Sequence, residues 1–407
     1  MLKKSLLNIA IAAAALSLTA CLDSGSSNEP EAKPITLGAV VQTVAADYSS
    51  SQVAQIDYDK DLDSYELTDG YMVKDKSDYT VASHLDSIFH IGRNSIDTVD
   101  FYNKDDLTTN LLGVSTNLAV EQSSGNPYTF IALNKDKGYV IRYGADKILV
   151  VDPTPTSAND FVLNTIDLSA YTVEGSEQAS PNAADAVIAD GKLFVVMQRM
   201  HIEGWTWTPN TAYIAVIDTE TDMEIETNAD TTDAFKGIPL SGVNPLGGSL
   251  DVFGDYVYVA ERSSYSSTDL SESKIEKVHV KNYQVSEVIA ADKIVNNQAP
   301  IKQAVIVSAT KGYFYVSAGW PEVSSIYEFN PKNGQIVNAD VTSTALNGEG
   351  IGYMAVDGKN QLWISVSSSD NPGIDIVDTS DNSLVTNRLT TELNPARIAF
   401  IEELSAE

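Results

Sequence analysis

The stretch Asp357–Asn382, DGKNQLWISVSSSDNPGIDIVDTSDN, contains the unit from which most of the chain is built. It reads as a polar turn, an apolar strand, a loop, a second apolar strand that ends in Asp, and a tight turn. The apolar runs are short, rich in Val, Ile and aromatic residues, and bounded by Gly, Asn, Asp or Pro, which is typical of β-strands. No helical apolar period persists along the chain, so no sizeable helix is expected.

Related copies of this unit precede it. The six further copies begin at Ala39, His84, Lys137, Ala189, Gly254 and Lys311. Each copy has a strand of small residues, two stronger strands around a variable loop, and a weaker last strand, which we call strands a, b, c and d. A repeat of about fifty residues with four strands is typical of a propeller blade.

The two ends of the repeat region complement each other. The first copy lacks a strand a, whereas the segment NPARIAFIEEL from Asn394 is a strand a with no strand b after it. Pairing these two pieces would close a ring and remove the open sheet edge, which would otherwise favour aggregation. The sequence therefore predicts an all-β, seven-bladed β-propeller of four-stranded blades, closed by the C-terminal strand in the first blade.

Several a strands begin alike, and two c strands end alike. The beginnings are GNPYTFIA at Gly125, SPNAADAVIA at Ser180, VNPLGGSLDVF at Val243 and LNPARIAF at Leu393, and the ends are IDT at Ile217 and VDT at Val377. Together they resemble the YVTN-type repeat of seven-bladed bacterial propellers. The resemblance covers Ala39–Leu404 and implies a fold, without implying an activity.

The N-terminal segment has the features of an export signal. Lys3 and Lys4 precede an apolar, Ala-rich core, and the segment ends in Leu-Thr-Ala-Cys21, which resembles a bacterial lipobox. That resemblance implies that Cys21 is lipidated. Because Leu22 and not Asp follows it, the resemblance also implies an outer-membrane location, with the protein anchored to the membrane through its N-terminal lipid alone.

The residues after the lipobox are Ser, Asn, Glu and Pro with little to bury, which favours a flexible stalk. The expected organisation is a signal peptide over residues 1–20, a lipidated Cys and stalk over 21–34, and a single propeller domain over 35–404.

Composition excludes several classes of function. The chain has 56 acidic and 26 basic residues, a net charge of −30, so double-stranded nucleic acid and anionic membrane surfaces would repel it. It contains a single Cys, so disulfides and zinc fingers are not expected. The four His residues are scattered and no GxSxG, GxGxxG or Walker A motif is present, so no cofactor or metal site is predicted.

The alternating run Asp57, Asp59, Asp61 and Asp63 lacks the Gly and Glu of an EF-hand loop and is interpreted as a turn.

One set of residues suggests binding. Alignment of the b-strand ends FHIGR, YVIRY, FVVMQR and YVAER places four arginines at nearly the same point of four consecutive blades: Arg93, Arg142, Arg199 and Arg262. Guanidinium groups suit carboxylate, phosphate or catecholate oxygens. The b–c loops also carry the aromatic residues Tyr143, Trp205, Trp207 and Trp320, and large side chains in polar loops mark binding surfaces. Alternatively, each Arg pairs with an acidic neighbour, such as Glu261 beside Arg262, and ties loops together.

Three functions fit these features. The first is a surface lipoprotein that binds a small anionic ligand at the b–c loop face. By analogy it looks like bacterial propeller lipoproteins that capture ferric siderophores for an outer-membrane transporter. The second is a scaffold or adhesin that binds a protein partner through the long loops Met200–Thr211 and Ser263–Ser273. The third is a lactonase-like hydrolase, which would need a His or carboxylate cluster that the sequence does not show.

Overall fold

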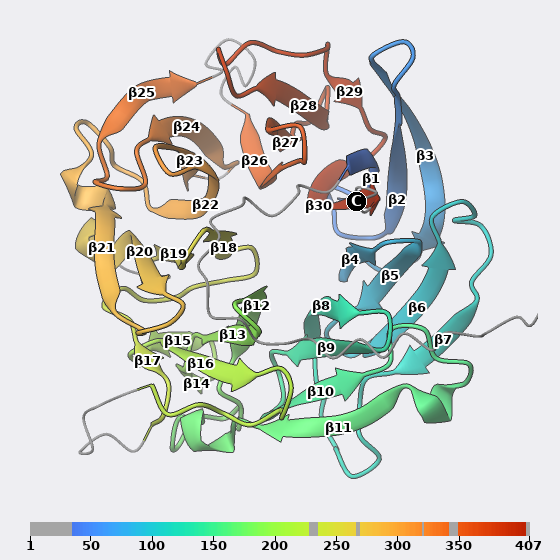
Figure 1. Ribbon diagram of the computed structural model, residues 1–407, viewed down its shortest axis with the longest axis vertical. Coiled ribbons are helices and arrows are strands. Elements are labelled where there is room, and N and C mark those ends of the chain that lie inside the picture. The colour runs from blue at the N-terminus through green and yellow to red at the C-terminus, as the bar shows by residue number, and fades with distance from the viewer. Residues whose placement is uncertain (1–34, 228–234, 266–268, 320, 342–348, 404–407) are drawn as a thin grey trace, which may run out of the picture. The chain divides into compact units, whose positions relative to one another are not determined.

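Seven four-stranded antiparallel sheets form the blades of a ring (Figure 1). The computed structural model describes residues 35–227, 235–265, 269–319, 321–341 and 349–403. In every blade, strand a lies at the centre of the ring and strand d at its rim (Figure 1). The prediction of a seven-bladed all-β propeller is therefore confirmed.

The strands of the first four blades follow in the order a, b, c, d. Blade one contains β30 (Asn394–Glu403), β1 (Ile35–Val44), β2 (Ser51–Asp59) and β3 (Ser64–Lys74). Blade two contains β4 (Tyr79–His84), β5 (Ser87–Gly92), β6 (Thr98–Asn103) and β7 (Leu112–Ser115). Blade three contains β8 (Pro127–Asn134), β9 (Lys137–Arg142), β10 (Lys147–Val151) and β11 (Val162–Asp167). Blade four contains β12 (Ala183–Ala189), β13 (Lys192–Met197), β16 (Tyr213–Asp218) and β17 (Ile238–Pro239).

The remaining blades have the same order. Blade five contains β18 (Leu250–Phe253), β19 (Tyr256–Arg262), β20 (Ser273–His279) and β21 (Val285–Ala290). Blade six contains β22 (Ile301–Ser308), β23 (Lys311–Ala318), β24 (Val323–Phe329) and β25 (Ile336–Val341). Blade seven contains β26 (Gly350–Val356), β27 (Gln361–Ser367), β28 (Gly373–Asp378) and β29 (Leu389–Thr390).

The helices of the described residues are four short 3-10 turns: η1 (Ala158–Asp160), η2 (Ser169–Tyr171), η3 (Leu270–Glu272) and η4 (Ala291–Lys293). None of them has the length or the apolar character that crossing a bilayer requires.

The ring closes in blade one. Strand β30 pairs antiparallel with β1, with Val41 opposite Ile398 and Ala39 opposite Phe400. The expected match between the two ends of the chain is therefore confirmed. Because β1 is paired with β30 on one edge and β2 on the other, its backbone N–H and C=O groups find partners on both sides.

Side chains between neighbouring blades form the core. Alternate residues of each strand point to opposite faces of its sheet, so each blade buries one set of side chains against each neighbour. Between blades two and three, the rings of Phe89 and Phe130 stack with centroids 4.0 Å apart. Complete burial of an apolar side chain contributes roughly 1.5–3 kcal/mol, so these layers supply the main force that assembles the ring.

Polar side chains join the inner strands of blades four to seven. Asp185 of β12 accepts a hydrogen bond from the Leu250 backbone N–H of β18 at 3.1 Å. Asp251 of β18 accepts one from Ile306 N–H of β22 at 2.5 Å. Gln303 of β22 donates to the carbonyl of Met354 in β26 at 2.8 Å and accepts from its N–H at 2.9 Å. These bonds hold in place the strands that line the central opening.

One segment that was expected to be a loop is a hairpin, and the expected acidic turn is present. The segment Met200–Thr211, interpreted as a long loop, contains a hairpin of β14 (Met200–Glu203) and β15 (Thr206–Pro209). Gly204, with φ +57, provides the left-handed backbone that its turn needs. The acidic run ends β2 and enters the β2–β3 turn, where Asp59 accepts hydrogen bonds from the N–H groups of Asp61 and Leu62.

Candidate functional site

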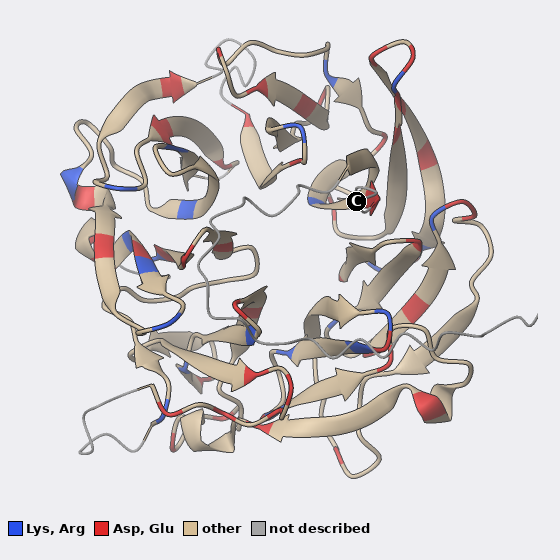
Figure 2. Cartoon of the chain, viewed as in Figure 1, with Lys and Arg blue, Asp and Glu red and all other residues tan. Residues whose placement is uncertain are grey.

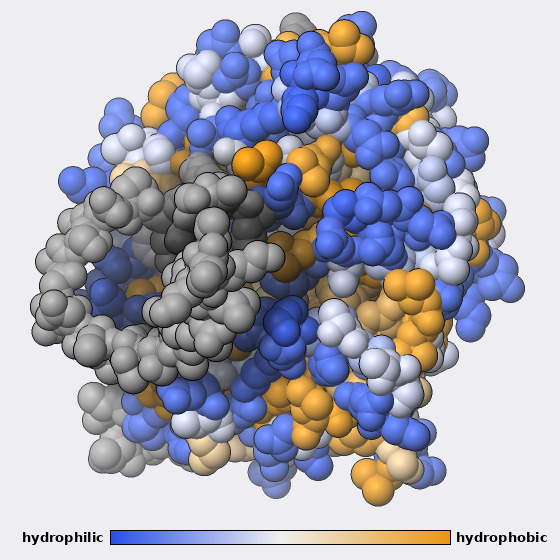
Figure 3. Space-filling model, turned by 45° about the vertical axis from the view of Figure 1, so that its right-hand side comes forward, coloured by the Kyte–Doolittle hydropathy of each residue, from blue (hydrophilic) through white to orange (hydrophobic). Residues whose placement is uncertain are grey.

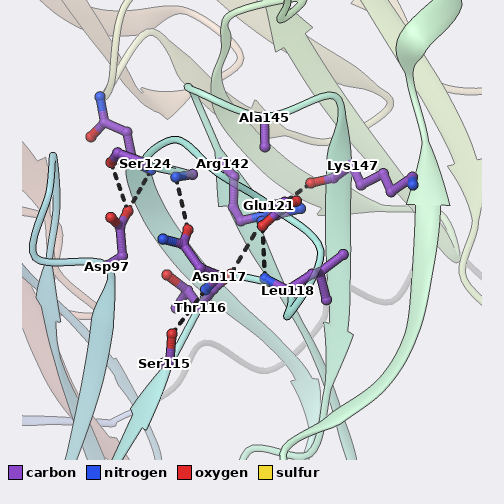
Figure 4. A network of polar contacts seen from close by, with 12 residues as sticks. Asp97, Ser115, Thr116, Asn117, Leu118, Glu121, Ser124, Arg142, Ala145 and Lys147 are labelled. Carbon is purple, nitrogen blue, oxygen red and sulfur yellow. Dashed lines mark hydrogen bonds and ion pairs between the residues drawn. The ribbon is translucent and has the colours of Figure 1, made fainter.

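Arg142 is enclosed by the protein. Its side chain is fully buried and lies against Glu121, with Nη1 2.7 Å from Glu121 Oε2 (Figure 4). It also donates to the carbonyl oxygens of Lys147, at 3.0 Å, and Thr116, at 3.2 Å. The guanidinium therefore ties β9 to the connection between β7 and β8, as the internal-pairing alternative would have it.

Arg199 is also held by its own blade and the preceding connection. It donates to the carbonyl oxygens of Tyr171 at 3.0 Å and Thr211 at 3.1 Å. Its Cζ lies 5.1 Å from the ring centroid of Tyr213 and 4.4 Å from that of Phe235, within cation–π range. These contacts fix the base of the β14–β15 hairpin.

Arg93 contacts Tyr128, and the positive charge of Arg262 also acts on the hydroxyl of that tyrosine. Arg93 Nη2 lies 2.5 Å from Asp78 Oδ1, and its Cζ lies 5.3 Å from the Tyr128 ring centroid. Burial raises the pKa of the Tyr128 hydroxyl to about 12, and the positive charges of Arg93 and Arg262 oppose that rise. Two of the four aligned arginines thus act on the same partly exposed phenol.

The charge of Arg262 is the less compensated of the two. Its Nε donates to the carbonyl of Lys302 at 3.2 Å. Within the part of the chain that the structure describes, no carboxylate lies within ion-pair distance of its guanidinium. A partly exposed Arg without a carboxylate partner can offer its remaining N–H donors to an anion.

A hydrogen-bonded chain supports the Tyr128 ring from behind. Tyr143 stacks on Tyr128 with centroids 4.5 Å apart and planes at 13°. The Tyr143 hydroxyl donates to Gln198 at 2.6 Å, and Gln198 donates to Asn244 at 2.8 Å. Since Tyr143 is only 3% exposed, its role is to fix Tyr128.

We call these six residues the mouth cluster: Arg93, Tyr128, Tyr143, Gln198, Asn244 and Arg262. They come from strand ends and connections of blades two to five. Neighbouring strands are antiparallel, so the b–c loops and the connections that lead into the inner strands lie on the same face of the ring. The mouth cluster therefore lies on the b–c loop face, beside the central opening.

The tryptophans lie in different settings. Trp205 is fully exposed in the turn of the β14–β15 hairpin. Trp207 of β15 is 37% exposed and packs edge-on against Tyr265, with centroids 6.2 Å apart. Trp320, like Cys21, lies outside the described residues. The hairpin thus extends an aromatic surface from blade four to blade five.

The described part of the chain is acidic throughout. Figure 2 shows Asp and Glu on all sides of the ring, with the basic residues interspersed among them. Among the coloured residues in Figure 3, hydrophilic ones predominate and the hydrophobic ones form separate groups between them. In a chain of net charge −30, an Arg over a tyrosine ring and a second Arg without a carboxylate partner among the described residues are a local exception.

One histidine of the described part of the chain is buried and neutral. Burial lowers the pKa of His90 to about 3, and its ring lies 3.1 Å from Gln42 and stacks on Tyr79. Among the residues that the structure describes, no group of three or more His, Cys, Asp or Glu side chains could hold a metal ion.

Sequence reasoning did not select Tyr128. It lies directly after Asn126-Pro127, a dipeptide that also precedes Leu246, in the connection before β18, and Ala396 of β30. When the three segments are aligned at this dipeptide, Tyr128 is the one aromatic residue among the three that follow it. That comparison would have identified Tyr128 as a candidate, because these segments lead into the inner strands.

Comparisons with known proteins show the fold. No protein-family model matches the chain, and no curated protein matches its sequence. A solved protein from Lactobacillus plantarum is 13% identical with a TM-score of 0.57, covering 90% of this chain and 99% of that one. A protein of Bacteroides fragilis named as a candidate 6-phosphogluconolactonase is 12% identical with a TM-score of 0.54, covering 89% and 98%. A Synechocystis apocarotenoid oxygenase variant is 8% identical with a TM-score of 0.54, covering 91% and 93%. Such different names on one architecture mean that the function must be argued from the site.

Proposed function

We propose that this protein binds a small anionic ligand with an aromatic or planar group at the mouth cluster. The observation that carries the proposal is the cation–π contact of Arg93 with the partly exposed ring of Tyr128, together with Arg262 of blade five, which has no carboxylate partner among the described residues. The guanidinium of Arg262 would pair with an oxygen anion, and the tyrosine ring would stack on the planar part. Trp207 and Tyr265 would form a second aromatic wall.

The ligand class includes aromatic metal chelates. A ferric siderophore-like chelate combines anionic oxygens with planar rings, the two features that arginine and tyrosine recognise. If Cys21 is lipidated as the lipobox resemblance implies, the protein would hold such a ligand at the outer membrane and pass it to a transporter there. In this proposal the protein is a binding protein and no catalytic step is assigned to it.

The test is a binding assay with the full-length chain in detergent. The probes are benzoate, 2,3-dihydroxybenzoate and a ferric tris-catecholate, and the readouts are calorimetry and tryptophan fluorescence. A charge-assisted hydrogen bond contributes about 1.5–3 kcal/mol, so Arg262→Gln should weaken binding roughly 10- to 100-fold. Lys135→Gln is the matched control, because Lys135 is exposed and pairs only with Asp136 at 3.1 Å. Unchanged affinity in Arg262→Gln, or no binding of any probe, would refute the proposal.

A further inference from the structure

A second candidate arginine lies on an inner strand of the ring. Arg397 of β30 stacks on Tyr353 of β26, with its Cζ 4.3 Å from the ring centroid. A Cβ on Gly248, which precedes β18, would lie 2.8 Å from Tyr353 Cε2 and 3.5 Å from Arg397 Nη1. Figure 1 shows β18, β26 and β30 as the innermost strands of their blades, and these contacts join three of the blades.

The donors of Arg397 are unused by its neighbours. Throughout the described ranges, its guanidinium makes no hydrogen bond and has no carboxylate within ion-pair distance. The nearby carboxylate of Asp185 is engaged by the backbone N–H groups of Leu250 and Ala186, at 3.1 and 3.0 Å. The guanidinium is partly exposed and carries five N–H donors, and Tyr353 orients it without accepting hydrogen bonds from them.

We propose that Arg397, held against Tyr353, forms an oxyanion subsite that accepts a carboxylate or phosphate-like group. The anion pairs with the guanidinium donors that no described residue uses. No covalent bond forms or breaks in the oxyanion itself.

This subsite is distinct from the mouth cluster, since the two share no side chain. They adjoin, because a Cβ on Gly247 would lie 4.0 Å from Tyr128 Cδ2 while Gly248 lies against Tyr353. A ligand with a second acidic group would therefore occupy the subsite and the mouth cluster together. This joint occupancy rests on the proposed function. Binding of a simple oxyanion at Arg397 does not depend on it.

The probe is sulfate, whose charge is constant near neutral pH, titrated into the full-length chain by calorimetry and thermal shift. Arg397→Gln should weaken sulfate binding about tenfold or more, whereas Arg397→Lys should recover part of it. Lys135→Gln, at an exposed residue outside both sites, should leave sulfate binding unchanged. The aromatic probes are titrated separately into Arg262→Gln, so the two proposals can fail separately. Equal sulfate affinity in Arg397→Gln and the wild type, or no sulfate binding at all, would overturn the subsite.

Discussion

Replacement of Arg142 by alanine should reduce stability and leave ligand binding intact. The change removes a buried guanidinium and leaves Glu121, 18% exposed, without its cation. It also deprives the carbonyls of Thr116 and Lys147 of their donor. Breaking a buried ion pair by removing one partner costs about 3–5 kcal/mol, so we expect a loss of about 4 kcal/mol.

That loss converts into a measurable shift. For the unit Pro34–Glu407 the unfolding entropy is roughly 0.8 kcal/mol/K, so the midpoint of thermal unfolding should fall by about 5 °C. Differential scanning fluorimetry and guanidinium unfolding measure it. In parallel, the aromatic probes of the mouth cluster should bind Arg142→Ala below its midpoint with wild-type affinity.

The controls separate a structural role from a binding role. Lys135→Ala removes an exposed ion pair, which is worth about 0–1 kcal/mol, and should change the midpoint little. Arg142→Met combined with Glu121→Leu removes both charges and should recover much of the loss. A midpoint in Arg142→Ala equal to that of the control, or a loss of ligand binding at unchanged stability, would refute this reasoning and return Arg142 to the binding site.

Two further variants test buried groups. Burial and the charge of Glu276 raise the pKa of Glu261 well above its usual range, so the native state holds the extra proton and stability falls as pH rises from about 4.3 through the folded-state pKa. Glu261→Gln should flatten that fall in guanidinium midpoints across this range, and an unchanged slope would contradict the assignment. Gly248→Ala should lower the thermal midpoint and weaken sulfate binding, because Gly248 has φ +80 and a Cβ there would lie 2.8 Å from Tyr353 Cε2. Gly247→Ala, whose Cβ would meet nothing closer than 3.7 Å, should do neither, and equal effects of the two would count against a specific contact.

The architecture could be predicted from the sequence because its determinants are local. Each blade is a run of short apolar strands with turn residues at fixed places, and every copy repeats this pattern. Closure of the ring could be predicted as well. The sequence from Asn394 has a strand a that no strand b follows, and the copy that begins at Ala39 has a strand b that no strand a precedes. The structure has both features where they were expected.

The candidate site was harder to predict because its contacts are not local. Alignment placed the four arginines at equivalent strand ends, but their surroundings depend on connections that do not repeat. Glu121, which encloses Arg142, lies in the β7–β8 connection, and Asp78, which pairs with Arg93, lies in the β3–β4 connection. Arg397 and Tyr353 meet Gly248 only because the ring brings distant segments together.

The closing pair of strands makes assembly depend on the last part of the chain. Strand β1 emerges first during synthesis, yet its partner β30 is the last strand to appear. The contacts that finish the ring join the most distant segments of the sequence, and such contacts are slow to form. Until they form, β1 presents an unpaired edge that other chains could join. A chain truncated before β30 would therefore be the species most prone to aggregate. For such a protein, chaperone protection is needed most in the interval between the appearance of β1 and the arrival of β30.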